Sequence, residues 1–337
     1  MIMKKPEIRP CLQSIKPYFP GKPIEEVERE LGLTDVVKMA SNENALGPSP
    51  LAVKAMQDQA EKVHIYPDGN CFYLKQALAD YLDLTPDNII LANGSDELLC
   101  ILTMTYLEPD EETIMVTPSF SEYEFATHLM GGAIREVPLV GEDFQYDLDS
   151  VLNTVTDKTK MIFICSPNNP TGTIVKKKDL ERFIQHLPEK TLLVLDQAYT
   201  EFTENPEHPD GIEYVEQGNP VIVLRTFSKI YGLAGLRVGY GIAHPDIVGD
   251  LNRARQPFNV NSMAQAAAIA ALQDHEHLEK SRAMVREGRK QMETGLKRLD
   301  LQAVPDEANF FFVDTKIDSK EVFQSLLKKG LIVRTGD

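Results

Sequence analysis

The sequence predicts an α/β fold, in which helices cover both faces of a mainly parallel sheet and a smaller α+β domain follows. Short, nearly continuous apolar runs alternate with amphipathic stretches of helical length, which is typical of parallel strands buried on both faces. Near Ala264 this alternation gives way to longer helical stretches. With 337 residues in the chain and about 150 residues per domain, about two domains are expected.

Six apolar runs are predicted as strands of the larger domain: Asn88–Ala92, Thr113–Thr117, Met161–Cys165, Thr191–Asp196, Val221–Thr226 and Leu236–Ile242. Amphipathic helices are predicted between them, at Glu97–Tyr106, Glu122–Met130 and Lys177–His186. Ligands of such folds bind beyond the carboxyl ends of the strands. The residues that directly follow the strands are therefore the candidates for a functional site.

The carboxyl-terminal part is predicted as a small α+β domain over residues 261–337, which residues 1–40 join, while residues 41–260 form the large domain. Its expected elements are helices at Ala264–Leu272, Glu276–Leu299 and Ser319–Lys329 and strands at Ala308–Val313 and Leu331–Val333. The sequence stops soon after the last of these strands, so we expect this domain to be truncated.

The charge and the cysteines favour a cytoplasmic protein. The chain has 35 Lys and Arg against 51 Asp and Glu, a net charge of −16, which disfavours binding to nucleic acids or anionic membranes. No apolar run approaches the roughly 18 residues of a membrane helix. The four cysteines lie far apart, so reduced thiols are expected rather than disulfides or a metal site: Cys11, Cys71, Cys100 and Cys165.

Lys229 is the candidate nucleophile. It ends the segment Thr226-Phe227-Ser228-Lys229 after a predicted strand, with hydroxyls beside it and Arg237 eight residues further on. A lysine in isolation would be a surface residue. An amine beside hydroxyls and a guanidinium suggests carbonyl chemistry next to a phosphate site, because a phosphate needs convergent donors and a positive charge.

Three polar residues after neighbouring strands are candidates for holding a pyridine ring. Asp196 ends a buried strand, where a carboxylate needs a cationic partner such as a protonated ring nitrogen. Tyr199 and Asn169 would then reach the phenolic oxygen of the ring. Asn169 belongs to Ser166-Pro167-Asn168-Asn169-Pro170-Thr171-Gly172, which is equally compatible with an ordinary loop.

The turn Asn93-Gly94-Ser95-Asp96-Glu97 joins a predicted strand to a helix. The free N–H groups at the start of that helix could bind a phosphate through the backbone. An ordinary helix start with favourable acidic residues in its first turn explains the same sequence.

Taken in order, these motifs resemble the class II, fold-type-I pyridoxal-phosphate-dependent aminotransferases, and more narrowly the histidinol-phosphate aminotransferases. Further matches are Ser41-Asn42-Glu43-Asn44, Tyr66-Pro67-Asp68-Gly69 and the segment from Thr226 to Tyr240, and the similarity runs from about Ile15 to the last residue. The resemblance implies a seven-stranded, mainly parallel sheet, pyridoxal 5'-phosphate as cofactor and a homodimer. It implies transamination between L-histidinol phosphate and 2-oxoglutarate, in histidine biosynthesis.

The resemblance also implies roles for individual residues. Lys229, Asp196 and Tyr199 would be catalytic, with Lys229 as the covalent attachment point of the cofactor. Tyr123 would stack on the cofactor ring; its other reading is an ordinary residue on a helix face. The residues implied to bind the cofactor are Tyr66 (from the partner subunit), Gly94, Ser95, Asp96, Tyr123, Asn169, Asp196, Tyr199, Thr226, Ser228, Lys229 and Arg237. Those implied to bind the substrate are Tyr18, Asn44 and Arg334, although Arg334 also fits an exposed arginine at a strand end.

Three departures from the family pattern accompany the resemblance. Gln197 stands where the family usually has glutamate, Ala45 stands where it has proline, and a further strand with a second substrate arginine does not follow residue 337. Three other functions remain open at this level: an aromatic amino-acid aminotransferase, a pyridoxal-phosphate-dependent decarboxylase of phosphorylated amino acids, and a catalytically weakened cofactor-binding protein.

Overall fold

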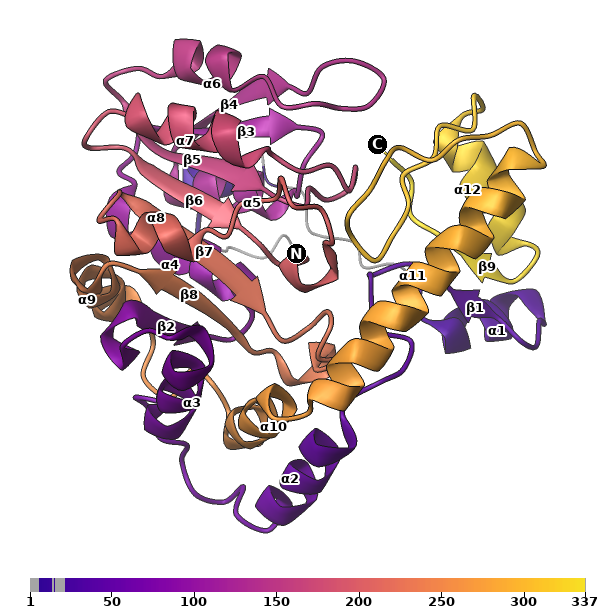
Figure 1. The fold of residues 1–337 in the computed structure, drawn as a ribbon, viewed down its shortest axis with the longest axis horizontal. Coiled ribbons are helices and arrows are strands. Elements are labelled where there is room, and N and C mark those ends of the chain that lie inside the picture. The colour runs from indigo at the N-terminus through magenta and orange to yellow at the C-terminus, as the bar shows by residue number, and fades with distance from the viewer. Residues whose placement is uncertain (1–5, 14, 16–21, 337) are drawn as a thin grey trace.

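The computed structural model describes residues 6–13, 15 and 22–336, and its centre is a seven-stranded sheet (Figure 1). The strand order is β2-β8-β7-β6-β5-β3-β4. Only β8 runs antiparallel to its neighbours, β2 and β7, so the predicted mainly parallel α/β sheet is confirmed. The strands are β2 (Ile89–Ala92), β3 (Glu112–Thr117), β4 (Ala133–Pro138), β5 (Thr159–Cys165), β6 (Leu192–Asp196), β7 (Val221–Thr226) and β8 (Gly239–Ala243).

Helices cover both faces of this sheet because alternate residues of its inner strands point to opposite sides. In β7, Val221 and Val223 pack in one core cluster, and Ile222 and Leu224 pack in the other. The first cluster joins the sheet to α2 (Pro50–Ala60), α3 (Phe72–Leu82), α6 (Leu148–Thr154), α7 (Lys177–Gln185), α8 (Ile212–Glu216) and α10 (Ser262–Leu272). The second joins it to α4 (Ser95–Tyr106), α5 (Glu122–Met130) and α9 (Pro245–Ala254).

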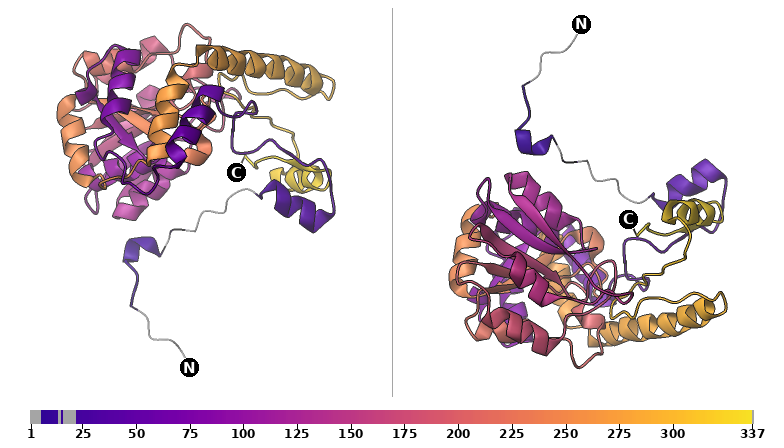
Figure 2. Two further views of the ribbon diagram at one scale, coloured as in Figure 1. Left: turned by 90° about the horizontal axis from the view of Figure 1, so that it is seen from below. Right: turned by 90° about the horizontal axis from the view of Figure 1, so that it is seen from above.

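A separate small core lies at one end of the molecule, and the long helix α11 (His275–Lys297) extends towards the same end (Figure 2). Here β1 (Val37–Lys38) pairs in parallel with β9 (Leu331–Ile332), between α1 (Ile24–Leu31) and α12 (Ser319–Leu327). The amino-terminal segment from residue 24 thus shares a core with the carboxyl-terminal elements. The helix α10, which the sequence assigned to the small domain, packs against α2 and α3 in the large core. The domain boundaries themselves stay a prediction.

Some strands differ from the sequence-based expectations. The sequence did not predict β4, an edge strand whose residues Ala133–Pro138 are mostly exposed and therefore lack an apolar run. The strand predicted at Ala308–Val313 is wrong: this segment is irregular and forms only an isolated bridge between Ala303 and Val313. Its side chains contact the large domain, as described below, instead of a neighbouring strand.

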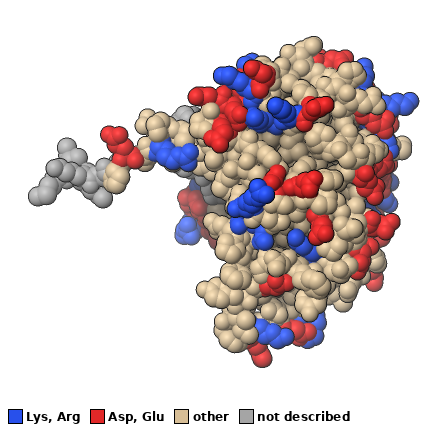
Figure 3. Space-filling view, turned by 90° about the vertical axis from the view of Figure 1, so that its left-hand side faces the viewer, with Lys and Arg blue, Asp and Glu red and all other residues tan. Residues whose placement is uncertain are grey.

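Short 3₁₀ turns complete the fold: η1 (Pro10–Leu12), η2 (Pro86–Asn88), η3 (Thr200–Phe202) and η4 (Ala234–Leu236). The turn η4 occupies the start of the predicted strand Leu236–Ile242, so β8 begins only at Gly239. Acidic and basic side chains are interspersed on the face shown in Figure 3. Within the described residues, no helix combines the length and the apolar character needed to cross a membrane.

Candidate functional site

The candidate site lies at the carboxyl ends of β5, β6 and β7, which are neighbours in the sheet. Cys165 at the end of β5 is paired with Asp196, and Asp196 is paired with Leu224 of β7. The segments that follow these strands, residues 166–172, 196–199 and 226–229, therefore leave the sheet at one edge. This is the location that the topology of an open α/β sheet favours for a ligand.

Lys229 reaches this edge with a partly buried side chain. Its Nζ donates a hydrogen bond to the carbonyl oxygen of Ser41 at 3.2 Å and lies 5.5 Å from the centroid of the Tyr199 ring. Burial lowers the pKa of Lys229 below the usual value of 10.5, because the surroundings disfavour the ammonium form. A lysine with a lowered pKa supplies the neutral amine that carbonyl chemistry needs.

Asp196 is a buried carboxylate with two hydrogen bonds. The Tyr123 hydroxyl donates to its Oδ2 at 2.8 Å, and the Ala198 N–H donates to its Oδ1 at 3.1 Å. Burial raises the pKa of Asp196 to about 6, an effect that these hydrogen bonds only partly oppose. A bound cation at this position would restore the ionised form, as the sequence-based argument requires.

Tyr123 differs from its expected role. Its side chain is fully buried, its ring stacks in parallel on Phe163 at a centroid distance of 4.8 Å, and its hydroxyl donates a hydrogen bond to Asp196. The structure thus uses this ring to support Asp196. Phe120, which sequence reasoning did not select, contacts Tyr123 edge-on at 5.7 Å and remains partly exposed. Phe120 is therefore the more accessible aromatic ring for stacking on a bound ligand.

Tyr199 and Asn169 lie on the two segments beside Lys229. The Tyr199 hydroxyl accepts a hydrogen bond from Asn42 Nδ2 at 3.1 Å, and burial raises its pKa. Asn169 is partly exposed, and its side chain forms no hydrogen bond within the described part of the chain. The preceding Asn168 is buried and structural, because its Nδ2 donates to the Pro118 carbonyl and to Thr171. Of the two asparagines, Asn169 is the one available to a ligand.

A second cluster surrounds the start of α4. Gly94 has φ +88°, and a Cβ atom there would lie 2.5 Å from Arg237 Nη2, so the guanidinium sits directly against this backbone. Arg237 donates to Asp96 Oδ2 at 2.9 Å and to Ser228 Oγ at 3.5 Å. The Ser228 N–H in turn donates to Thr226 Oγ1 at 3.0 Å. A guanidinium, a hydroxyl and a helix N-terminus thus converge, and they form a suitable cup for a phosphate.

The predicted substrate residues lie in different surroundings. Asn44 donates from Nδ2 to the Ile230 carbonyl at 2.7 Å and to Ser281 at 2.9 Å, so here its amide positions a loop. Arg334 is exposed, two residues after β9, and Tyr18 lies outside the described residues. Their contact with substrate stays a prediction. Tyr66 is 82% exposed on the loop between α2 and α3, where its ring lies 5.1 Å from that of Phe258.

Sequence reasoning missed the residues that close the site from the carboxyl-terminal side. Asn309 Nδ2 donates to the Asn42 carbonyl at 3.1 Å, and the Phe310 ring packs edge-on against Tyr199 at 5.1 Å. Both belong to the segment predicted as a strand. Their separation in sequence from Asn42 and Tyr199 left no local signal that could have identified them.

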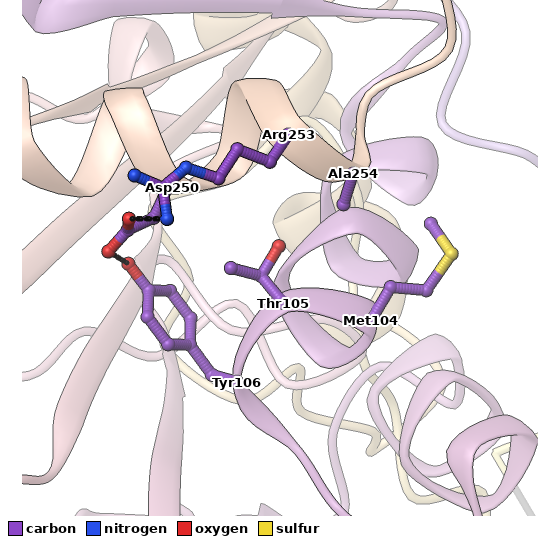
Figure 4. A pocket seen from close by; sticks show the side chains of 6 residues that line it. All are labelled: Met104, Thr105, Tyr106, Asp250, Arg253 and Ala254. Atoms are coloured by element: carbon purple, nitrogen blue, oxygen red, sulfur yellow. Dashed lines mark hydrogen bonds and ion pairs between the residues drawn. The ribbon is translucent and has the colours of Figure 1, made fainter.

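A surface hollow of about 430 Å³ between α4 and α9 is not part of this site (Figure 4). It is lined by Met104, Thr105, Tyr106, Asp250, Arg253 and Ala254, and the Tyr106 hydroxyl donates to Asp250. It lies at the carboxyl end of α4, whereas the phosphate-like cup lies at the amino end of this 12-residue helix, roughly 17 Å away.

Comparisons with known proteins show which proteins this chain is similar to. The family described as aminotransferase class I and II matches residues 34–337. The chain is 53% identical to histidinol-phosphate aminotransferase of Moorella thermoacetica over 333 residues, which cover 98% of this chain and 86% of the relative. It is 46% identical to histidinol-phosphate aminotransferase 2 of Carboxydothermus hydrogenoformans, covering 98% of this chain and 91% of the relative.

Two solved structures have the same fold. The crystal structure of histidinol-phosphate aminotransferase from Sinorhizobium meliloti in complex with pyridoxal-5'-phosphate superimposes with a TM-score of 0.89 at 30% identity, covering 97% of this chain and 88% of that one. A double mutant of Thermus thermophilus aspartate aminotransferase superimposes with a TM-score of 0.85 at 25% identity, covering 98% and 92%.

Proposed function

Because this chain belongs to the class I and II aminotransferase family, we propose that it transfers an amino group from L-histidinol phosphate to 2-oxoglutarate, with pyridoxal 5'-phosphate as cofactor. The products would be imidazole-acetol phosphate and glutamate, and the pathway would be histidine biosynthesis in the cytoplasm. The 53% identity to a histidinol-phosphate aminotransferase over nearly the whole chain carries this proposal. The arrangement of Lys229, Asp196 and Arg237 supports it.

The residues at the site fit this cofactor. Asp196 is a buried carboxylate whose raised pKa calls for a cationic partner, which a protonated pyridine nitrogen would provide. The cup of Arg237, Ser228 and the start of α4 would hold the phosphate. When bound, the cofactor would supply an electron-withdrawing ring that stabilises negative charge on the substrate carbon bearing the amine.

The protein side chains would then divide the remaining work. Lys229 Nζ, whose pKa is lowered by burial, would act as the base that takes a proton from that carbon and as the acid that gives a proton to C4′ of the cofactor. Asp196 would hold the proton on the ring nitrogen, and the Tyr123 hydroxyl keeps its carboxylate in place. Tyr199 and Asn169 would donate to the ring oxygen. Phe120 would cover the ring in place of the expected Tyr123.

We also infer that the active enzyme is a homodimer to which Tyr66 contributes across the interface. Large apolar side chains are exposed on the loop before α3, at the start of that helix and at residue 258: Val63, Ile65, Tyr66, Phe72, Tyr73 and Phe258. Apolar side chains gathered in this way favour a protein–protein contact. The partner's loop would bring Tyr66 to the cofactor phosphate.

Borohydride reduction followed by peptide mapping tests the cofactor site. The purified, cofactor-loaded protein should be yellow, and reduction should leave a pyridoxyl group on the peptide that contains Lys229. Lys229→Ala should abolish both the adduct and turnover. An adduct on another lysine would contradict the assignment.

A substrate panel tests the reaction. L-histidinol phosphate should be the best amino donor with 2-oxoglutarate as acceptor, and the kinetics should be ping-pong because both half-reactions share one site. A clear preference for phenylalanine or tyrosine would instead indicate an aromatic amino-acid aminotransferase. Release of carbon dioxide from a phosphorylated amino acid would indicate a decarboxylase.

A further inference from the structure

Four buried polar atoms close to the catalytic segments have no hydrogen-bond partner among the described residues. They are Oε2 of Glu201, Nε of Arg225 and the hydroxyl oxygens of Tyr231 and Tyr240. The side chains of Arg225, Tyr231 and Tyr240 are at least nine-tenths buried. Buried polar groups in folded proteins are nearly always hydrogen-bonded, so a group of four such atoms requires an explanation.

These side chains face one another. Arg225 of β7 and Tyr240 of β8 are directly paired across the two antiparallel strands, so both point to the same face of the sheet. The ring of Phe227 lies 4.9 Å from that of Tyr231 and 5.6 Å from that of Tyr240, which places both hydroxyl-bearing rings around one residue.

Their charges also act on one another. Burial raises the pKa of Tyr231, and the nearby Glu201 and Tyr240 raise it further. Burial raises the pKa of Glu201 to about 7, and the charge of Arg225 is the largest effect that opposes this rise. The Tyr240 side chain also contacts Arg225, and the Tyr231 side chain contacts Tyr81. In a buried site, charges act on one another over several ångströms, so these groups share one polar neighbourhood.

The four atoms are also chemically complementary. Arg225 Nε–H is a donor, the two tyrosine hydroxyls can each donate or accept, and Glu201 Oε2 is an acceptor, so one water can accept two hydrogen bonds and donate two within this group. We propose that Glu201 is a positioning residue, whose carboxylate binds Arg225, Tyr231 and Tyr240 through a buried bridging water. Such waters typically make about three hydrogen bonds to buried groups that would otherwise lack a partner.

The location of this polar cluster explains what it would position. Glu201 follows Tyr199 by two residues, and Arg225 and Tyr231 flank Lys229 in the chain. Arg225 Nη2 also donates to Asp210 at 2.8 Å and to Gln197 Oε1 at 3.3 Å, directly beside Asp196. The cluster would therefore fix the segment that carries Asp196 and Tyr199 relative to the segment that carries Lys229.

The neutral side chain of Gln197 makes the charge of Glu201 more important for Arg225 in this chain. Its neutral amide accepts from Arg225 and from the Gly211 N–H, and its Nε2 donates to the Pro209 carbonyl at 2.7 Å. A neutral Gln197 adds no negative charge, so Asp210 and Glu201 are the carboxylates that balance the buried guanidinium. Asp210 already forms an ion pair with Nη2, whereas Oε2 of Glu201 has no hydrogen-bond partner among the described residues.

A double-mutant cycle on the cofactor-free protein tests whether the cluster is one hydrogen-bonded unit. Glu201→Gln and Tyr240→Phe should each lower the melting temperature, and the double variant should lose clearly less than the sum of the two. The matched control is Tyr214→Phe, which removes another buried hydroxyl without a partner, on α8, where the nearby carboxylates are Glu181, Glu213 and Asp210. Its effect should add to that of Glu201→Gln.

Additive losses for Glu201→Gln and Tyr240→Phe would overturn the proposed cluster. If Glu201→Gln does not fold, the cycle between Tyr231→Phe and Tyr240→Phe provides the same test, because both hydroxyls would bind the same water. Additivity in that second cycle would equally contradict the proposal.

The positioning role rests on the proposed function and is tested on the loaded enzyme. Glu201→Gln should lower kcat by about tenfold, the loss expected for one hydrogen bond, while KM for both substrates stays within about twofold. Glu201→Gln should also shift the pH at which the absorbance of the bound cofactor is halfway through its pH-dependent change. The control Glu207→Gln, which alters an exposed carboxylate, should not shift this pH. If kcat and this pH midpoint are unchanged while the stability cycle is non-additive, the polar cluster exists but Glu201 does not position the catalytic segments. Failure of the wild-type protein to transaminate would refute the proposed function instead.

Discussion

At the carboxyl end of β6, Asp196 combines a buried position with a pKa raised to about 6. Burial is also the largest effect on Lys229, but there it lowers the pKa, because the charged form of a lysine is the protonated one. Without a ligand, both residues are thus shifted towards their neutral forms. Binding of a cationic ring beside Asp196 would reverse the first shift, so the state of this carboxylate depends on the cofactor.

Asp196→Asn should therefore separate catalysis from stability. Turnover should fall by several orders of magnitude, because an amide cannot hold the ring proton. In the cofactor-free wild type, the folded state holds the Asp196 proton more tightly than the unfolded state does. This tighter proton binding adds at most about 3 kcal/mol to the free energy of unfolding. The contribution is complete below about pH 4 and is lost as pH rises through about 6.

Melting temperatures of the cofactor-free proteins from pH 4 to 8 provide the measurement. The stability of Asp196→Asn relative to wild type should rise across this range, whereas Asp149→Asn, at a carboxylate whose side chain is 65% exposed, should show little change. Turnover of Asp196→Asn within a few-fold of wild type would exclude the proposed role.

At the scale of elements, the junction of β2 and α4 depends on a glycine. Gly94 has φ +88° and ψ 166°, a region that residues with a side chain rarely occupy, and it lies against the guanidinium of Arg237. The close approach lets Arg237 contact Asp96 and Ser228 together. The shape of the phosphate cup therefore depends on the lack of a side chain at this position.

Gly94→Ala should displace Arg237 and weaken binding of pyridoxal 5'-phosphate by about 1.5–3 kcal/mol, the contribution of a charged hydrogen bond. It should also destabilise the fold by about 1–3 kcal/mol through backbone strain. Gly218→Ala is the matched control, because Gly218 has φ +76° but no atom within 4 Å of a new Cβ. Fluorescence titration should show normal cofactor affinity for the control only; equal affinities for both variants would argue against the cup.

At the scale of the whole molecule, the segment that follows α11 packs against the large core beside the site. Asn309 and Phe310, beyond the long helix α11, contact Asn42 and Tyr199, so the carboxyl-terminal part helps to enclose the edge of the large sheet. On another surface, Tyr66 is exposed with other apolar side chains around α3. The proposed dimer would cover these side chains and complete each cup with a residue of the partner.

A mixed dimer of Tyr66→Phe and Lys229→Ala subunits tests this arrangement. If Tyr66 acts across the interface, one site carries both changes and the other carries neither, so about half of the wild-type activity should remain. If Tyr66 acts within its own subunit, each site carries one change, and activity at limiting cofactor should be close to zero. Tyr66→Phe homodimers, as the reference, should retain cofactor more weakly by about 1.5–3 kcal/mol.

The sequence was sufficient to predict the mainly parallel sheet, most of its strands and the placement of Lys229, Asp196 and Arg237 near one edge. Apolar runs and helical periodicity are local properties, and parallel strands necessarily bring their carboxyl ends to the same edge. The edge strand β4 escaped prediction because an exposed strand needs no apolar run, and the segment after α11 resembled a strand because it is locally apolar.

Contacts between distant segments decided the rest. Tyr123 supports Asp196, 73 residues away, and Asn44 holds the Ile230 carbonyl, 186 residues away. Arg225 and Tyr240 come together only because β7 and β8 pair. Burial and hydrogen-bond partners depend on which segments meet in space, and no local pattern in a single sequence encodes them.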